Sequence, residues 1–123
     1  MLASSQLVAF VSTMDPQRSR RFYESTLGLR LVEETPFACV FDAAGTQLRV
    51  TRVGSLTPAP FTVLGWHVAD VEAAVAALVD RSVAFFRYEG MVQDDLGIWT
   101  SPSGARIAWF HDPDGNVLSL TQL

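Results

Sequence analysis

Few side chains in this sequence could carry out chemistry. There are two histidines, His67 and His111, and one cysteine, Cys39. The sequence contains no Ser/His/Asp or Cys/His arrangement, no CxxC pair and no phosphate-binding glycine loop, so hydrolase, redox and nucleotide-binding functions lack their usual motifs. Cys39 lies in the apolar run 37–41, which favours a small buried side chain over a catalytic thiol. His67 is therefore the main candidate for acid–base work.

The charge balance excludes several partners. The formal net charge is −4 and all nine basic residues are arginines. Nucleic-acid binders need a clustered basic face, so we expect no nucleic acid partner. No apolar run approaches the roughly 20 residues of a membrane helix, and no secretory signal is evident, which predicts a soluble cytoplasmic protein without a membrane partner.

The elements that must position these residues follow the same order twice. In the first half, a strand at 7–13 leads to Asp15 and Pro16, which begin a helix running to about Thr26, with Gly28 as its stop. Further strands are predicted at 29–33, 37–42 and 47–53. In the second half, Asp70 caps a helix, and strands are predicted at 63–68, 83–88, 105–110 and 116–121.

We therefore predict one α+β domain of 123 residues made of two βαβββ repeats, with repeat one at 6–54, a connector at 55–60 and repeat two at 61–123. The two helix caps are offset by 55 residues and the turn glycines Gly45 and Gly115 by 70, so the second repeat carries about 15 extra residues. These fall between Tyr88 and Ala105, as a long loop or an extended hairpin. The segment is either a functional lid or a tolerated surface insertion.

Two motifs make the pattern more specific. They are Asp-Pro-x5-Phe-Tyr-x3-Leu-Gly at 15–28 and Trp-Phe-His-Asp-Pro-Asp-Gly-Asn-x-Leu-x-Leu at 109–120. With these motifs the whole chain resembles the vicinal-oxygen-chelate superfamily of glyoxalases, bleomycin-resistance proteins and extradiol dioxygenases. The resemblance implies two curved mixed sheets around a cleft, commonly in a homodimer. It indicates a fold rather than an activity.

Enzymes of that superfamily hold a divalent metal with His, Gln or Glu at four strand positions. The matching residues here are Val8, Arg49, Val63 and Ser119. Valine offers no donor atom, serine is a poor ligand, and a guanidinium repels a cation. We therefore predict neither a metal nor another cofactor.

Strand alternation directs several side chains to the expected cleft. His67 could be a general base, an anchor for a ligand, or a histidine at the strand's rim hydrogen-bonded near Asp70. Arg49 requires an anion, either on a ligand or on a protein acid. The predicted ligand-binding residues are Phe10, Arg49, His67, Trp99, Ser119 and Thr121.

The three tryptophans are candidate ligand contacts, because indole rings stack on planar or cationic ligands. Trp66 has the alternation of a residue packed under a helix, and Trp99 lies on the inserted segment as a cleft or lid residue. Trp109 has no marker that fixes its face, and the core is the favoured position.

The sequence favours a metal-independent small-molecule-binding protein of the bleomycin-resistance type, with an apolar cleft. The alternative is an enzyme (lyase, epimerase, dioxygenase or thiol transferase) that uses His67 in a non-standard metal or acid–base site. A third interpretation is an interaction module whose cleft is filled by its own side chains.

Overall fold

The computed structural model describes residues 1–123, which form two compact units, Met1–Thr57 and Pro58–Leu123. We call them unit 1 and unit 2. Unit 1 contains β1 (Val8–Thr13), α1 (Pro16–Arg21), η1 (Phe22–Thr26), β2 (Arg30–Glu34), β3 (Ala38–Ala43) and β4 (Thr46–Arg52). Unit 2 contains β5 (Thr62–His67), α2 (Val71–Val79), β6 (Phe85–Phe86), β7 (Trp99–Thr100), β8 (Arg106–His111) and β9 (Val117–Gln122). The predicted α+β class, with mixed sheets, is confirmed.

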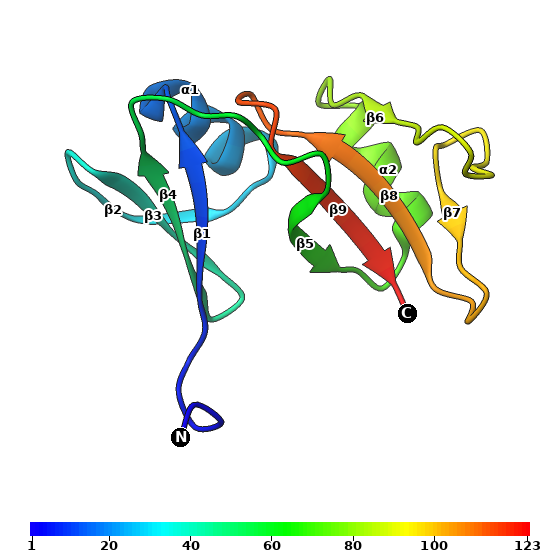
Figure 1. Ribbon diagram of the computed structural model, residues 1–123, viewed down its shortest axis with the longest axis horizontal. Helices are drawn as coiled ribbons and strands as arrows, with labels where there is room; N and C mark the ends of the chain where they lie inside the picture. Colours follow the sequence, from blue (N-terminus) through cyan, green and yellow to red (C-terminus); the bar gives the residue numbers. More distant parts are fainter. The chain divides into compact units, whose positions relative to one another are not determined.

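The sheet of unit 1 has the strand order β1-β4-β3-β2, with β1 parallel to β4 and the other pairs antiparallel (Figure 1). The core lies between this sheet and the helical segment. Tyr23 is fully buried there, with its ring 5.9 Å from that of Phe41. A buried hydrogen bond of 2.7 Å from the Ser19 hydroxyl to Thr13 Oγ1 ties the helix to β1. The side of the sheet away from α1 is left without a helix.

The first helix is shorter and more varied than predicted. Asp15 caps it as expected, accepting a hydrogen bond of 3.2 Å from the Arg18 amide. The α-helix ends at Arg21, however, and continues as a π-helical turn, in which the Leu27 amide donates to the Phe22 carbonyl. The π-helical turn covers five residues, too few for apolar periodicity to separate it from an α-helical turn. Gly28 then ends the segment with φ 76°, as predicted.

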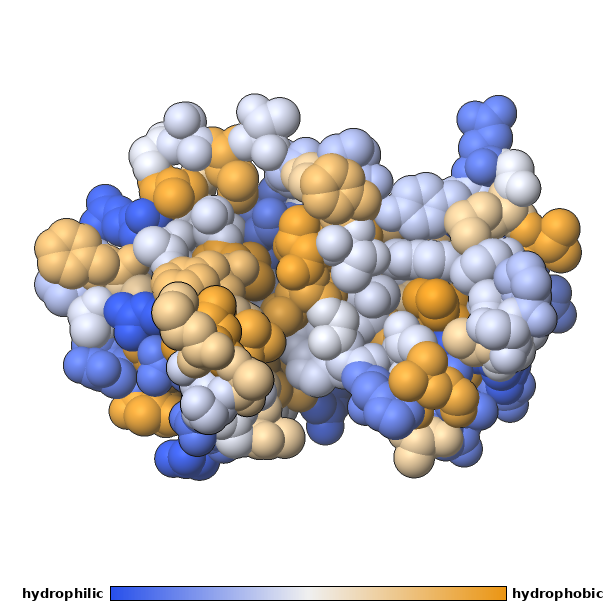
Figure 2. Space-filling model, turned by 60° about the horizontal axis from the view of Figure 1, so that its bottom comes forward, coloured by the Kyte–Doolittle hydropathy of each residue, from blue (hydrophilic) through white to orange (hydrophobic).

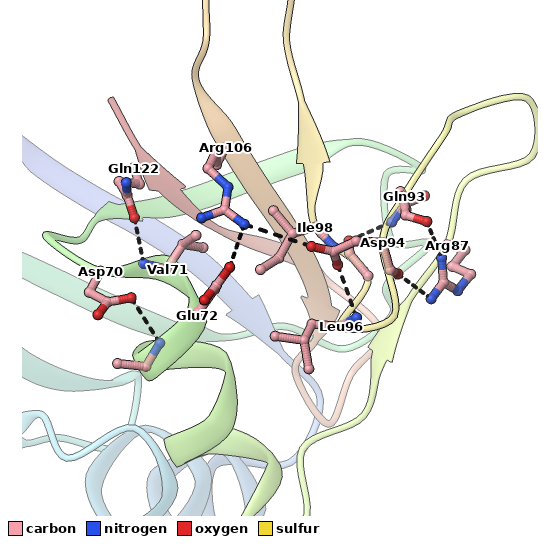
Figure 3. Close-up of polar contacts among 12 residues, drawn as sticks. Asp70, Val71, Glu72, Arg87, Gln93, Asp94, Leu96, Ile98, Arg106 and Gln122 are labelled. Atoms are coloured by element: carbon pink, nitrogen blue, oxygen red, sulfur yellow. Dashed lines mark hydrogen bonds and ion pairs between the residues drawn. The ribbon is translucent and has the colours of Figure 1, made fainter.

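Unit 2 repeats the arrangement with the order β5-β9-β8-β6, and β7 also pairs with β8. Helix α2 crosses one side of β8 and β9 (Figure 1). Its first turn is fixed twice, because Asp70 accepts from the Ala73 amide at 3.1 Å and Gln122 Oε1 accepts from the Val71 amide at 2.9 Å (Figure 3). Trp66 packs on this helix-covered side, as predicted, with its ring stacked on Phe110 at 6.5 Å.

The predicted strand at 83–88 is wrong in extent, because only Phe85 and Phe86 pair with β8. The chain then leaves the sheet and is held by polar contacts (Figure 3). Gln93 Oε1 accepts from the Tyr88 amide at 2.8 Å, and Gln93 Nε2 donates to the Gly97 carbonyl at 2.7 Å. Arg87 donates to the carbonyls of Gln93 and Asp94. The inserted segment is therefore an ordered loop that ends in a short hairpin strand, β7.

None of the helices combines the length and apolar character that crossing a membrane would require.

Candidate functional site

Each sheet has one face without a helix, and the registers of the two sheets are equivalent. In unit 1, Arg49 on β4 lies between Phe10 on β1 and Val40 on β3. In unit 2, Ser119 on β9 lies between Gly65 on β5 and Trp109 on β8. We call the two helix-free surfaces the unit-1 face and the unit-2 face. The same three positions carry Phe-Arg-Val on one face and Gly-Ser-Trp on the other.

The unit-1 face is apolar and accessible, with one cationic group. Phe10 is 62% exposed, and Val8 and Val32 are exposed as well. Arg49 is half-buried and donates one hydrogen bond of 3.3 Å from Nη1 to Gln47 Oε1. None of the ion pairs found in residues 1–123 involves Arg49. The predicted alternative, a structural pair between Arg49 and a protein acid, is therefore wrong for this structure.

A hollow of about 270 Å³ lies on this face; neither Arg49 nor Thr51 lines it, but Val40, the register partner of Arg49, does. Its lining also includes Val8 and Gln47, which are register partners, and the pair formed by Arg30 and Asp42. Hydrophobic (orange) and hydrophilic (blue) residues lie side by side over the surface shown in Figure 2. The hollow likewise combines apolar side chains with polar and charged ones, so it offers both contact area and groups that can orient a small ligand.

Thr51, two residues beyond Arg49 on the same strand, has a buried hydroxyl oxygen without a hydrogen-bond partner. No other buried side-chain nitrogen or oxygen in residues 1–123 is left unsatisfied in this way. Strand alternation places Thr51 on the unit-1 face with Arg49. An unpaired buried polar group is costly, so this hydroxyl calls for an explanation.

The unit-2 face carries an aromatic cluster, which we define as Phe86, Tyr88, Trp99, Trp109 and His111. Trp109 is the centre, with ring centroids 5.1 Å from Tyr88 (edge-to-face) and 6.3 Å from Trp99. Phe86 stacks on His111 at 4.2 Å and meets Tyr88 edge-on at 5.1 Å. These are the separations at which aromatic rings attract one another.

Trp109 is the residue that the sequence left unassigned. It is 7% exposed, so the expectation of burial is correct, but it pairs with Ser119 and lies on the helix-free face. Its indole Nε1 donates to Thr62 Oγ1 at 3.2 Å, which fixes the ring. The sequence does not predict Phe86 and Tyr88 as site residues. The strand expected at 83–88 is reduced to Phe85–Phe86, and Tyr88 reaches the cluster from the loop that follows.

Four of the six predicted ligand-binding residues come together on the unit-2 face. His67, Thr121, Ile107 and Trp99 form one row across β5, β9, β8 and β7, and Ser119 lies in the adjacent row. The other two, Phe10 and Arg49, are register partners on the unit-1 face. The sequence predicts all six in one cleft; the structure shows one group of neighbours on each sheet, and their binding of a ligand stays a prediction.

His67 is exposed at the end of β5. One alternative predicted from the sequence is a hydrogen bond of His67 near Asp70; in the structure the Asp70 carboxylate accepts from the Ala73 amide as the cap of α2. Ser119 is 6% exposed, and its hydroxyl occupies the space where a side chain on Gly65 would begin, 2.7 Å from the position of a Cβ. Ser119 and Thr121 are the hydroxyl groups of this face.

The four positions that the resemblance assigns to a metal do not fit one. Val8 and Arg49 lie on the unit-1 face, Ser119 lies on the unit-2 face, and Val63 stands at an irregularity of β5. They offer one hydroxyl and one cation to a divalent ion, which needs imidazole nitrogen or carboxylate oxygen. No three His, Cys, Asp or Glu side chains in residues 1–123 gather in a way that could hold a metal.

Cys39 does not contribute a nucleophile. It is 1% exposed, as predicted for a small buried side chain. Burial raises the pKa of its thiol, and the nearby Glu34 carboxylate raises it further. A thiol with a raised pKa is mostly protonated at neutral pH and reacts slowly.

Comparison with known proteins agrees with this fold. Residues 6–120 match the model of the Glyoxalase/Bleomycin resistance protein/Dioxygenase superfamily. A lactoylglutathione lyase from Agrobacterium tumefaciens is similar in structure, with a TM-score of 0.76 and 16% identity over 99% of this chain and 96% of the other. A superfamily member from Sphaerobacter thermophilus DSM 20745 also has a TM-score of 0.76, with 22% identity over the full length of both chains. A search of curated protein sequences finds no significant match.

The family model covers nearly the whole chain, both units form mixed sheets as expected, and both signature motifs lie within the matched residues. The chain therefore belongs to the Glyoxalase/Bleomycin resistance protein/Dioxygenase superfamily.

Proposed function

We propose that this chain is a metal-independent small-molecule-binding protein that takes a planar aromatic ligand on the unit-2 face. The observation that carries the proposal is the aromatic cluster, in which Trp99 and Trp109 lie 6.3 Å apart on a sheet face without a helix. Indole rings give planar ligands large contact area at low entropic cost. Trp99 is half-buried and so leaves part of its ring accessible.

The polar groups of the unit-2 face support a neutral or cationic ligand. The two central rows carry no Asp, Glu or Arg; their polar side chains are Ser119, Thr121 and His67. Hydroxyl groups can orient a ligand by hydrogen bonds, while the aromatic faces attract a cation. Sequestration of such a compound requires no metal, in keeping with the residues at the four family positions.

Calorimetric titration with 2-naphthol, naphthalen-2-ylmethylammonium and the non-aromatic cyclohexylmethanol tests the proposal. We expect the two naphthalenes to bind and cyclohexylmethanol to bind far more weakly. Trp99→Ala should weaken naphthalene binding roughly tenfold, because an aromatic pair contributes about 1.4 kcal/mol at its upper end. The matched control is Trp66→Phe, on the helix-covered side, which should bind as the parent does. Equal losses in both variants, or no binding of either naphthalene, would contradict the proposal.

A second candidate is an enzyme of the same superfamily that uses His67 for acid–base chemistry. It is favoured by the place of His67 in one row with Thr121 and Trp99. The variant His67→Ala separates the two functions. A binding protein loses only the part of its ligand affinity that His67 contributes, whereas an enzyme loses turnover of its substrate while its fold, measured by circular dichroism, is unchanged.

We also propose that residues 1–123 act as one domain and that the protein is a homodimer. Exposed apolar side chains of unit 1 that neither proposed site uses, namely Leu2, Met14 and Phe37, support self-association, since exposed apolar surface often marks an interface. Light scattering at several concentrations tests this, with the mass of a dimer expected and the mass of a monomer contradicting it.

A further inference from the structure

We propose that the unit-1 face is a second binding site, which takes the carboxylate or phosphate of a small organic anion between Arg49 and Thr51. The inference is argued from residues of unit 1 alone and does not rest on the site proposed for the unit-2 face. Two unrelated observations on the same strand point to it, a guanidinium without an acidic partner and a buried hydroxyl without any partner.

Arg49 has spare capacity for an anion. A guanidinium carries five N–H donors in a planar fork that matches an oxyanion. Arg49 uses one of them, on the neutral amide oxygen of Gln47 at 3.3 Å, a long distance for such a bond. A half-buried cation with this single contact leaves its charge uncompensated, and an oxyanion would supply both the charge and the acceptors.

Thr51 supplies the second contact. Two residues along a strand span about 6.6 Å, with both side chains on one face, so one oxyanion can lie between Arg49 and Thr51. The Thr51 hydroxyl is buried in the ligand-free protein, so it reaches the anion by rotation about its Cα–Cβ bond. The Thr51 hydroxyl is a donor with no acceptor in the protein. An anionic oxygen would be the acceptor that it lacks.

The body of the ligand has a place beside the anion. The hollow of about 270 Å³ is lined by Val8, Val40 and Gln47, on the side of Arg49 opposite to Thr51. Its volume lies near the lower end of small-molecule pockets, which suits a body of about one ring. Asp42, the register partner of Gln47, also lines the hollow, and its carboxylate lies 3.7 Å from Arg30 Nη2, which offsets its repulsion of an anion.

Calorimetry with four probes tests the site: benzoate, phenyl phosphate, uncharged benzamide and inorganic phosphate. We expect benzoate and phenyl phosphate to bind at least tenfold more tightly than benzamide, a difference of about 1.4 kcal/mol. Phenyl phosphate should also bind more tightly than inorganic phosphate, because only the former fills the hollow. An NMR titration should shift the Nε–H signal of Arg49 and the amide signal of Thr51.

Variants locate the effect. Arg49→Gln should abolish the preference for the charged probes, Arg49→Lys should restore part of it, and Thr51→Val should reduce it severalfold. The controls are Arg52→Gln and Thr46→Val, on the same strand with the opposite alternation, which should keep the preference. Thermal unfolding of each variant verifies that it is folded.

Three results would overturn the inference. They are equal binding of benzoate and benzamide, equal loss in Arg49→Gln and Arg52→Gln, and equal affinity for inorganic and phenyl phosphate, which would remove the role of the hollow. None of them bears on naphthalene binding by the unit-2 face, so the two proposals fail separately.

Discussion

The two units place different side chains at equivalent positions of the same sheet. In the central row, unit 1 has exposed Phe10, cationic Arg49 and small Val40, whereas unit 2 has Gly65, Ser119 and the buried indole of Trp109. The large aromatic side chain of this row is on the edge strand β1 in unit 1 and on the central strand β8 in unit 2. The backbone pattern is thus held constant while the chemistry of the face changes.

The side chains of the helix-free faces, rather than the backbone, determine the ligand preferences that we propose for the two units. The helix-covered sides resemble each other, because both are filled by apolar side chains that stabilise the unit. The helix-free faces have diverged into a cationic face with a hollow and an uncharged aromatic face. We expect the ligands of the two faces to differ in the same sense, and substitutions at equivalent positions test this.

The largest effect should come from the central strands. Trp109→Ala removes a buried indole and its hydrogen bond to Thr62, so we expect a loss of about 3–5 kcal/mol in the free energy of unfolding. The equivalent change Val40→Ala removes two methyl groups and should cost about 2 kcal/mol. Urea unfolding measures both. Similar losses would show that the larger side chain of Trp109 contributes no more to stability than Val40 does.

The edge-strand position should show a smaller effect that can be reversed. Gly65→Ala places a Cβ 2.7 Å from the Ser119 hydroxyl and should cost about 1 kcal/mol, even though alanine favours the folded strand more than glycine does. In the double variant Gly65→Ala/Ser119→Ala the clash is gone, so the cost relative to Ser119→Ala alone should vanish. A persistent cost would place the strain elsewhere than at the hydroxyl.

Thr51→Val should stabilise the ligand-free protein by about 1 kcal/mol, because it replaces an unsatisfied buried hydroxyl with a methyl group of the same shape. The same variant weakens the proposed anion site, so stability and binding should change in opposite directions. Thermal unfolding with and without benzoate provides the measurement. A destabilised Thr51→Val would mean that the hydroxyl is already satisfied in solution.

The smallest effect concerns the helix-covered side, where Cys39 and Ala108 hold equivalent positions. The raised pKa of the Cys39 thiol means that the folded state holds the proton more tightly than the unfolded state does. Stability should therefore fall as the pH rises above the ordinary thiol pKa of 9.0, and Cys39→Ala should remove this part of the pH dependence. Unfolding between pH 8 and pH 10 checks the difference. Identical pH dependence in both proteins would show that the thiol is accessible.

Much of the fold could be read from the sequence because its signals are local. Asp15 and Asp70 begin the helices and Gly28 ends the first one, and each acts within a few residues. The π-helical turn at 22–26 and the short β6 were not predicted. The turn is too short to show a period of its own, and β6 is limited by contacts of Gln93 across the inserted loop.

The site was predicted in outline only. Alternation grouped Ser119 with Thr121 and Arg49 with Phe10 correctly as neighbours, but whether these residues bind a ligand stays a prediction. Trp109 could have been assigned from the turn at 112–115, because His111 pairs with Val117 and two residues further back Trp109 must face Ser119. The lack of an ion pair at Arg49 depends on side-chain positions, which no spacing in the sequence encodes.

The most direct test of metal-independent binding by the unit-2 face uses the three indole Nε1–H signals in a ¹H–¹⁵N NMR spectrum, assigned by single Trp→Phe variants. Protein dialysed against EDTA is titrated with naphthalen-2-ylmethylammonium. The signals of Trp99 and Trp109 should shift in a saturable manner while that of Trp66 stays in place, and added Zn²⁺ or Mn²⁺ should change nothing. Shifts that appear only after metal is added, or that move Trp66 as much as Trp99, would contradict the account.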